Sequence, residues 1–216
     1  MNMINIHEIY QSIQGESTLA GMPCTFVRLA GCPLSCHYCD TEQAIPFDSG
    51  RAMSIAHVIA QVKDMGNPLV LVTGGEPLAQ KSCIDLLLGL LELDVIVQLE
   101  TSGALDVKPV PQMVRKVMDL KTPDSGEEKR NRWENLQYLY KHDEIKFVLA
   151  SRCDYEWCKQ VIEQRLHDTS ATILLSPCWG KLTSSDLSAW ILEDRLPVRM
   201  QLQMHKVIWG AEAKGV

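Results

Sequence analysis

The sequence predicts an α/β fold, and more specifically a partial, open (β/α)6-type TIM barrel. Strand-like apolar runs alternate with amphipathic helical runs along the chain, which is typical of a parallel sheet covered by helices. About six such units fit into the 216 residues, whereas a closed eight-stranded barrel takes ~250 residues. An open doubly wound sheet is the alternative. With 46% hydrophobic and 22% charged residues, we expect a single domain spanning residues 1–216.

The first half of the chain begins this alternation. A strand over residues 24–31 ("CTFVRLAG") leads directly into a cysteine-rich loop, so the loop is expected at the carboxyl end of a strand. A helix over residues 53–66 has its apolar residues on one face, with Ser54 as the N-cap and Gly66 as the stop. The following elements are expected as a strand over 69–77, a helix over 83–93 and a strand over 95–103.

The second half repeats the pattern, apart from a polar stretch over residues 123–132 that is long enough to be a mobile loop. In either architecture the ligands gather at the carboxyl ends of the strands. The remaining elements are expected as strands over 114–123, 144–150, 171–180 and 199–207, and as helices over 133–141, 155–167 and 187–195.

The charge distribution argues against a nucleic-acid partner. The net charge is −6, and the one basic run, near Arg130, is short, whereas DNA and RNA binders carry a basic patch. The N-terminus lacks a basic segment followed by an apolar core, and no stretch is long enough to cross a bilayer. We therefore expect a cytoplasmic protein, with no membrane partner, that acts on a small molecule.

Three cysteines follow the spacing C-x3-C-x2-C at Cys32, Cys36 and Cys39. Thiolates suit zinc or an iron–sulfur cluster, and this spacing alone does not separate the two. A structural zinc would need a distant fourth ligand, such as His37 or Cys83. A 4Fe–4S cluster with three protein ligands leaves one iron free to bind another molecule, by the same logic that leaves a catalytic zinc one position open. The other cysteines are interpreted mostly as small buried apolar residues.

The cysteine spacing, with Tyr38 directly before the third cysteine, resembles the signature of the radical S-adenosylmethionine (SAM) superfamily. "TGGEP" at residues 73–77 resembles its second signature, whose glycines leave the backbone open to the SAM amino group. The resemblance extends to the 7-carboxy-7-deazaguanine synthase family and covers most of the chain in order. The segments that carry it are "IQGE" (13–16), "FVRLAGC" (26–32), "CDT" (39–41), "LETSG", "DLKTP", "EIK" and "QMHK" (203–206).

This resemblance implies a carbon–nitrogen lyase that converts 6-carboxy-5,6,7,8-tetrahydropterin to 7-carboxy-7-deazaguanine with loss of ammonia, in queuosine-type 7-deazapurine biosynthesis. It implies a 4Fe–4S cluster, SAM and Mg2+ as cofactors, an external electron donor of the flavodoxin or ferredoxin type, and a homodimer. Two alternatives remain at this point. One is a glycyl-radical enzyme activase that acts on a partner protein, and the other is a zinc-stabilised binding module.

The resemblance also implies roles for particular residues. Cys32, Cys36 and Cys39 would hold the cluster, and Thr41 would bind Mg2+. Arg28 and Glu16 would be catalytic: a guanidinium facing a site needs an anionic partner, either the pterin carboxylate or an internal glutamate such as Glu16.

Two groups of binding residues complete the implied site. Glu16 and Gln14 together could read the donor and acceptor edge of an aminopyrimidinone, and His205 is placed on the last strand. Glu100 could accept ribose hydroxyls or be merely solvated. The tail over 207–216 extends past the end of some relatives. The implied substrate contacts are Ile13, Gln14, Gly15, Glu16, Arg28, Thr73 and His205. The implied SAM contacts are Tyr38, Asp40, Gly75, Glu76, Asp119, Leu120, Lys121, Ser176, Pro177, Cys178 and Trp179.

Overall fold

A computed structural model describes residues 2–216, which form one nine-stranded sheet in the order β3-β1-β2-β4-β5-β6-β7-β8-β9. From β2 to β9 in this order the neighbouring strands are parallel, while β1 is antiparallel to both β2 and β3. Strands β3 and β9 lie at the two edges of the sheet, so the predicted open α/β barrel is confirmed. The strands are β1 Met3–Ile13, β2 Pro23–Leu29, β3 Arg51–Ser54, β4 Leu69–Gly74, β5 Ile96–Thr101, β6 Arg115–Asp119, β7 Glu144–Leu149, β8 Thr172–Pro177 and β9 Arg199–Met200.

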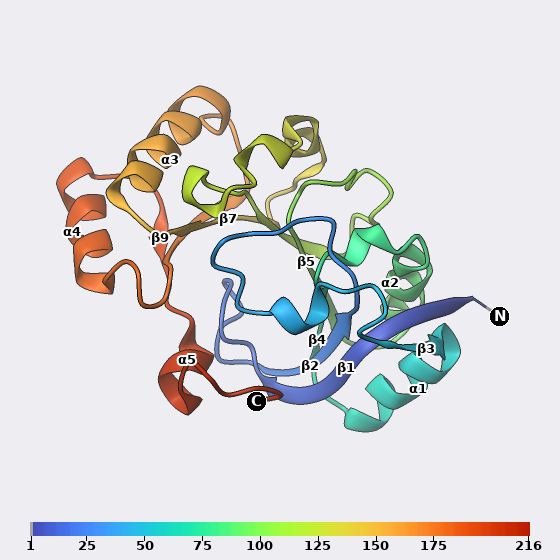
Figure 1. The fold of residues 1–216 in the computed structure, drawn as a ribbon. Coiled ribbons are helices and arrows are strands. Elements are labelled where there is room, and N and C mark those ends of the chain that lie inside the picture. Colours follow the sequence, from blue (N-terminus) through green and yellow to red (C-terminus); the bar gives the residue numbers. More distant parts are fainter. Residues whose placement is uncertain (1) are drawn as a thin grey trace.

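Helices α1 to α4 lie around the outside of the curved sheet (Figure 1). One hydrophobic cluster lies between α1, α2 and the amino-terminal half of the sheet, and a second lies under α3 and α4. The predicted ends of α1 are confirmed, because Ser54 accepts a hydrogen bond from His57 N and Gly66 adopts a left-handed conformation. The helices are α1 Ile55–Met65, α2 Cys83–Leu91, α3 Arg152–Arg165, α4 Ser184–Asp194 and α5 Met204–Trp209.

Strand β1 was not predicted, and a change of phase within it explains why. Ile4 and Ile6 are buried in the first cluster, but a β-bulge follows Ile6 and shifts the inward positions by one residue. Tyr10 then faces the other side of the sheet, where it stacks on Phe26. Because the apolar alternation is broken midway, a strand of 11 residues shows no clean period of two.

Three other segments differ in detail from the expected elements. The helix expected over residues 133–141 is a shorter 3-10 helix, Trp133–Tyr138. The expected last strand is only β9, and the chain then turns into α5. The stretch expected to be a mobile loop contains two short 3-10 helices, Pro123–Ser125 and Glu128–Arg130.

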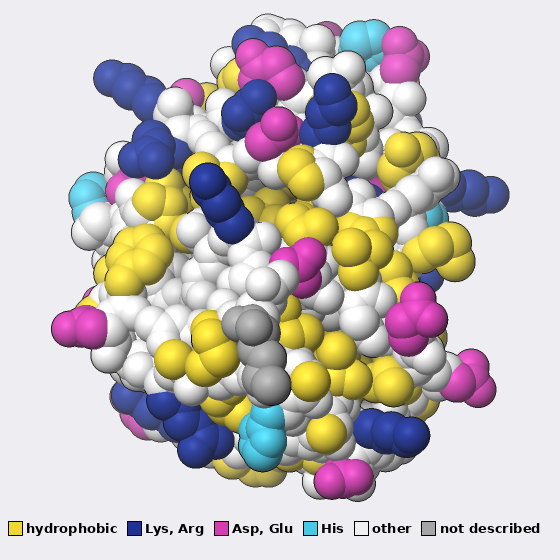
Figure 2. Space-filling model, turned by 90° about the vertical axis from the view of Figure 1, so that its right-hand side faces the viewer, with side chains coloured by type: hydrophobic (Ala, Val, Ile, Leu, Met, Phe, Trp, Pro, Cys, Tyr) yellow, Lys and Arg dark blue, Asp and Glu magenta, His cyan; other side chains and the backbone are white. Residues whose placement is uncertain are grey.

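The side of the molecule formed by α1, α2 and β3 shows hydrophobic side chains interspersed with acidic and basic ones (Figure 2). Leu88 of α2 is 48% exposed there. Among residues 2–216, no helix is both long and apolar enough to cross a membrane.

Candidate active site

Two adjoining hollows open at the carboxyl ends of the parallel strands, each with a cavity volume of about 140 Å³. Arg28 and Thr73 line the first hollow, and Cys36 and Cys39 line the second. Four residues line both hollows: Glu16, Asp40, Glu100 and Lys206. Two ligands bound side by side would therefore meet along this shared wall.

The cysteine loop is held in place from both sides. Its Cys32 N–H donates to Ile45 O at 3.0 Å, and His37 N–H donates to Ser125 O at 3.0 Å. Ser35 N–H donates to the Glu127 carboxylate at 2.7 Å. The segment that the sequence suggested to be mobile thus supports the loop.

The three thiols fit an iron–sulfur cluster by their chemistry. All three are free and half-buried, on one loop, and soft thiolates are the usual ligands of such clusters. Burial raises the pKa of Cys36 to about 11 and raises the pKa of Cys32 and Cys39 as well, while the nearby Lys121 ammonium favours the thiolates. Bound metal would overcome the effect of burial, because a coordinating thiol loses its proton.

The arrangement gives little support to a zinc site. Cys83, one of the two candidate fourth ligands, is fully buried in the hydrophobic cluster beside α1. His37 is the other candidate, and its Nδ1 atom lies 3.2 Å from Asp124 O.

The glycine turn after β4 packs directly on the cysteine loop. A Cβ atom on Gly74 would lie 2.3 Å from Leu29 O, and one on Gly75 would lie 2.5 Å from Gly31 O. The N–H groups of Gly75 and Glu76 already donate to these two carbonyls, at 3.2 and 2.9 Å. The glycines are therefore required for close strand packing, a reason that differs from the open SAM contact expected from the sequence.

The Glu76 carboxylate is fully buried and does not line either hollow. It accepts hydrogen bonds from Thr101 Oγ1, from Ser102 N and Oγ, and from Leu78 N. Any contact of Glu76 with SAM is thereby restricted to its backbone.

The second hollow collects part of the predicted SAM set. The Tyr38 hydroxyl lies 2.8 Å from Thr122 Oγ1 and donates to Val148 O at 2.9 Å, and burial raises the pKa of Tyr38. Lys121 pairs with Asp119 at 3.2 Å. The predicted SAM residues that line this hollow are Tyr38, Asp40, Lys121, Cys178 and Trp179. Those that do not are Gly75, Glu76, Asp119, Leu120, Ser176 and Pro177.

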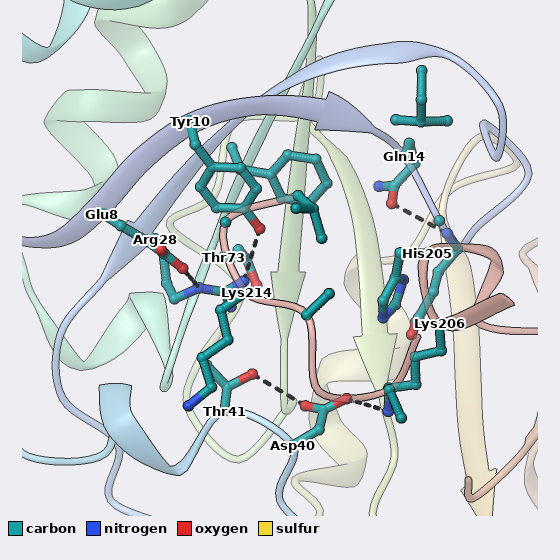
Figure 3. Close-up of a pocket in the computed structure, with 18 of the residues that line it drawn as sticks. Glu8, Tyr10, Gln14, Arg28, Asp40, Thr41, Thr73, His205, Lys206 and Lys214 are labelled. Carbon is teal, nitrogen blue, oxygen red and sulfur yellow. Dashed lines mark hydrogen bonds and ion pairs between the residues drawn. The ribbon is translucent and has the colours of Figure 1, made fainter. Parts of the chain in front are cut away.

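The first hollow collects the whole predicted substrate set, namely Ile13, Gln14, Gly15, Glu16, Arg28, Thr73 and His205, together with Thr41. Figure 3 shows Glu8, Tyr10 and Arg28 on one side of it and His205 and Lys206 on the other. Arg28 Nε donates to Glu8 at 2.7 Å, and its Nη2 donates to the Tyr10 hydroxyl at 3.2 Å. The internal partner of Arg28 is therefore Glu8 and not Glu16.

The residues expected to read an aminopyrimidinone are already bound within the protein. Gln14 Nε2 donates to Gln98 at 2.5 Å, and the Glu16 carboxylate accepts from Gln203 at 2.7 Å and from Lys146. Lys146, which sequence reasoning missed as a site residue, stands in the quoted "EIK" segment. It lines the second hollow and is 3.4 Å from Asp119. Although burial opposes it, the carboxylates of Glu16 and Asp119 raise the pKa of Lys146.

Glu100 lies between the two hollows, where its carboxylate accepts a hydrogen bond from Thr73 Oγ1 at 3.0 Å. Burial raises the pKa of Glu100 to about 7, while Lys146 and Arg28 favour its charged form and Glu16 disfavours it. The carboxyl group is partly buried and lines both hollows.

Helix α5 and the tail cover the first hollow. His205 is on this helix and not on a strand, and burial lowers its pKa. Met204 N–H donates to Gly15 O at 2.9 Å, and Lys206 pairs with Asp40 at 3.0 Å. The tail contributes Gly210, Ala211, Ala213, Lys214, Gly215 and Val216 to the lining.

Comparisons with known proteins show the family of this chain. The model of the radical SAM superfamily matches residues 27–125. The 7-carboxy-7-deazaguanine synthase of Chlorobaculum tepidum is 44% identical over 99% of this chain and 97% of its own length, and that of Koribacter versatilis is 42% identical over 99% and 100%.

Solved structures show the same fold. The crystal structure of QueE from Escherichia coli has a TM-score of 0.75 at 24% identity and covers 94% of this chain and 95% of its own. Streptococcus suis SuiB bound to S-adenosylmethionine has a TM-score of 0.56 at 16% identity, over 80% of this chain and 45% of its own. Because it is 44% and 42% identical to these two curated relatives over nearly the full length of the chains, this chain belongs to the 7-carboxy-7-deazaguanine synthase family, within the radical SAM superfamily.

Proposed function

We propose that the protein converts 6-carboxy-5,6,7,8-tetrahydropterin to 7-carboxy-7-deazaguanine with loss of ammonia, as a radical SAM enzyme of 7-deazapurine biosynthesis. The observation that carries the proposal is the pair of adjoining hollows. One is lined by two cysteines of the C-x3-C-x2-C loop and the other by Arg28, and they share four wall residues. Such a pair suits a cofactor and a substrate that must react with each other.

The second hollow is the proposed place for SAM. Cys32, Cys36 and Cys39 would hold the cluster, with Tyr38 and Trp179 beside the cofactor. When bound, the cluster and SAM supply the one-electron chemistry that removes a hydrogen atom from the substrate. The chain itself would position the reactants and exclude water, which limits side reactions.

The first hollow is the proposed place for the pterin. The N–H groups of Arg28 that Glu8 and Tyr10 leave free could bind its carboxylate. Thr41 and Asp40 line the same hollow, and the Thr41 hydroxyl donates to Asp40 at 3.1 Å. Mg2+ prefers such oxygen ligands and keeps several positions for water and substrate, so we propose Thr41 as its protein ligand.

The proposal includes three features of the working protein. The whole chain would act as one domain, as a homodimer, and would receive its electron from a small redox protein of the flavodoxin or ferredoxin type. Eight cysteines that are all free suit the reducing cytoplasm.

An anaerobic assay tests the proposal. Reconstituted protein supplied with the carboxytetrahydropterin, SAM, Mg2+ and a reductant should be brown and should release 7-carboxy-7-deazaguanine and ammonia. Cys36→Ala should lose cluster and product, while Cys153→Ala, which removes an exposed thiol of α3, should keep both. A colourless, zinc-loaded protein, or a radical transferred to a polypeptide without ring contraction, would contradict it.

A further inference from the structure

Glu8 lies directly beside Arg28, and we propose that it is a positioning residue that makes the site selective for a carboxylated pterin. The proposal rests on the proposed function and deepens it. Glu8 would hold the guanidinium by one edge, so that the other edge faces the hollow. Selectivity would then depend on a residue that does not itself need to touch the substrate.

The local backbone brings Glu8 to this position. Ile6 pairs with Leu29, and Glu8 pairs with Arg28, so two steps along β1 match one step along β2. Ile6 faces the core, and without the bulge Glu8 would face it as well, because side chains alternate along a strand. The bulge between them reverses the alternation and turns Glu8 into the first hollow with Tyr10.

The geometry of the guanidinium determines which N–H donors of Arg28 remain for a ligand. An arginine has five N–H donors in a rigid fork. Its Nε–H is taken by Glu8 at 2.7 Å, and one Nη2–H is taken by the Tyr10 hydroxyl at 3.2 Å. Three N–H groups remain, two on Nη1 and one on Nη2, and they are available as donors to the oxygens of a carboxylate.

The neighbouring aromatic side chains limit movement of the pair. Tyr10 stacks on Phe26 with ring centroids 4.9 Å apart and an angle of 9° between the planes. The side chains of Arg28 and Glu8 are 15% and 30% exposed. A flexible arginine normally loses conformational freedom when it binds an anion, so holding it beforehand should favour binding.

The test compares two ligands. Dissociation constants are measured for 6-carboxytetrahydropterin and for tetrahydropterin without the carboxyl group, on the reconstituted protein with SAM and without reductant. Glu8→Ala should weaken the carboxylated ligand about tenfold and leave the other within about twofold. Glu8→Gln, which keeps a hydrogen-bond acceptor, should recover part of the preference. In turnover, KM should rise and kcat should change little.

A matched control lies on the same strand. Gln11 is exposed and bonds to Met65 O, outside both hollows, so Gln11→Ala should keep the wild-type preference. Equal preference in Glu8→Ala and wild type would overturn the inference, and so would an equal loss of both ligands, which indicates a structural role. If Glu8→Ala does not fold, the same comparison on Glu8→Gln decides. A wild-type protein that does not prefer the carboxylated pterin would instead contradict the proposed function.

Discussion

Lys146→Met should destabilise the protein strongly. Lys146 is 7% exposed and pairs with both Glu16 and Asp119. Removing one partner of a buried ion pair leaves a charge without compensation and costs about 3–5 kcal/mol of the free energy of unfolding. With a urea dependence of about 2–3 kcal/mol per molar, the unfolding midpoint should fall by roughly 1–2.5 M. The measurement is urea unfolding of the apoprotein followed by circular dichroism.

Two further measurements make this result specific. The double variant Lys146→Met with Glu16→Gln should lose less than the sum of the single losses, since the residues are in contact. Glu156→Gln, which removes the exposed pair with Arg152, should cost only about 0.3–0.5 kcal/mol. A loss as small as this for Lys146→Met would refute the reasoning.

Three other predictions concern residues that line the first hollow. Burial raises the pKa of Glu100 to about 7, above about 4.3 in the unfolded chain, so its contribution to stability should fall as pH rises from 5 to 7; Glu100→Gln should remove that decline in urea unfolding. Lys206→Ala releases α5 from Asp40, whose side chain is half exposed, and at about 1 kcal/mol for the pair chymotrypsin should cut after Trp209 about fivefold faster. Gly15→Ala would place a Cβ 2.3 Å from His205 Nδ1 and should cost about 1–3 kcal/mol, measured by thermal unfolding; an unchanged melting temperature would contradict the contact.

Much of the fold could be predicted because most strands are buried on both faces and read as apolar runs. Strands β4 and β8 and helix α1 follow the expected ranges closely. The N-terminal strand was missed because the bulge after Ile6 breaks its period. The last segment was assigned to a strand because its apolar residues alternate, although the chain after β9 leaves the sheet and turns into α5.

The sequence predicted which residues line the site better than it predicted which of them contact one another. The placement of Arg28, Thr73 and His205 in one hollow matches the expected substrate set, because loops at one edge of a parallel sheet converge. The partners could not be predicted in the same way. That Glu8 pairs with Arg28 depends on a bulge. That Lys146 pairs with Glu16 depends on the approach of a residue of β7 to a residue of the loop after β1, 130 positions away in the sequence. Such long-range pairs leave no local pattern.

The shared wall has a consequence for how the family can diversify. Glu16, Asp40, Glu100 and Lys206 face both hollows, so a substitution there that suits a new substrate also changes the surroundings of the cofactor. Glu8, Tyr10, Phe26 and the tail reach only the first hollow. Relatives that act on new substrates should therefore differ first at these residues of the first hollow. The four residues of the shared wall should change more slowly, and their substitutions should be correlated.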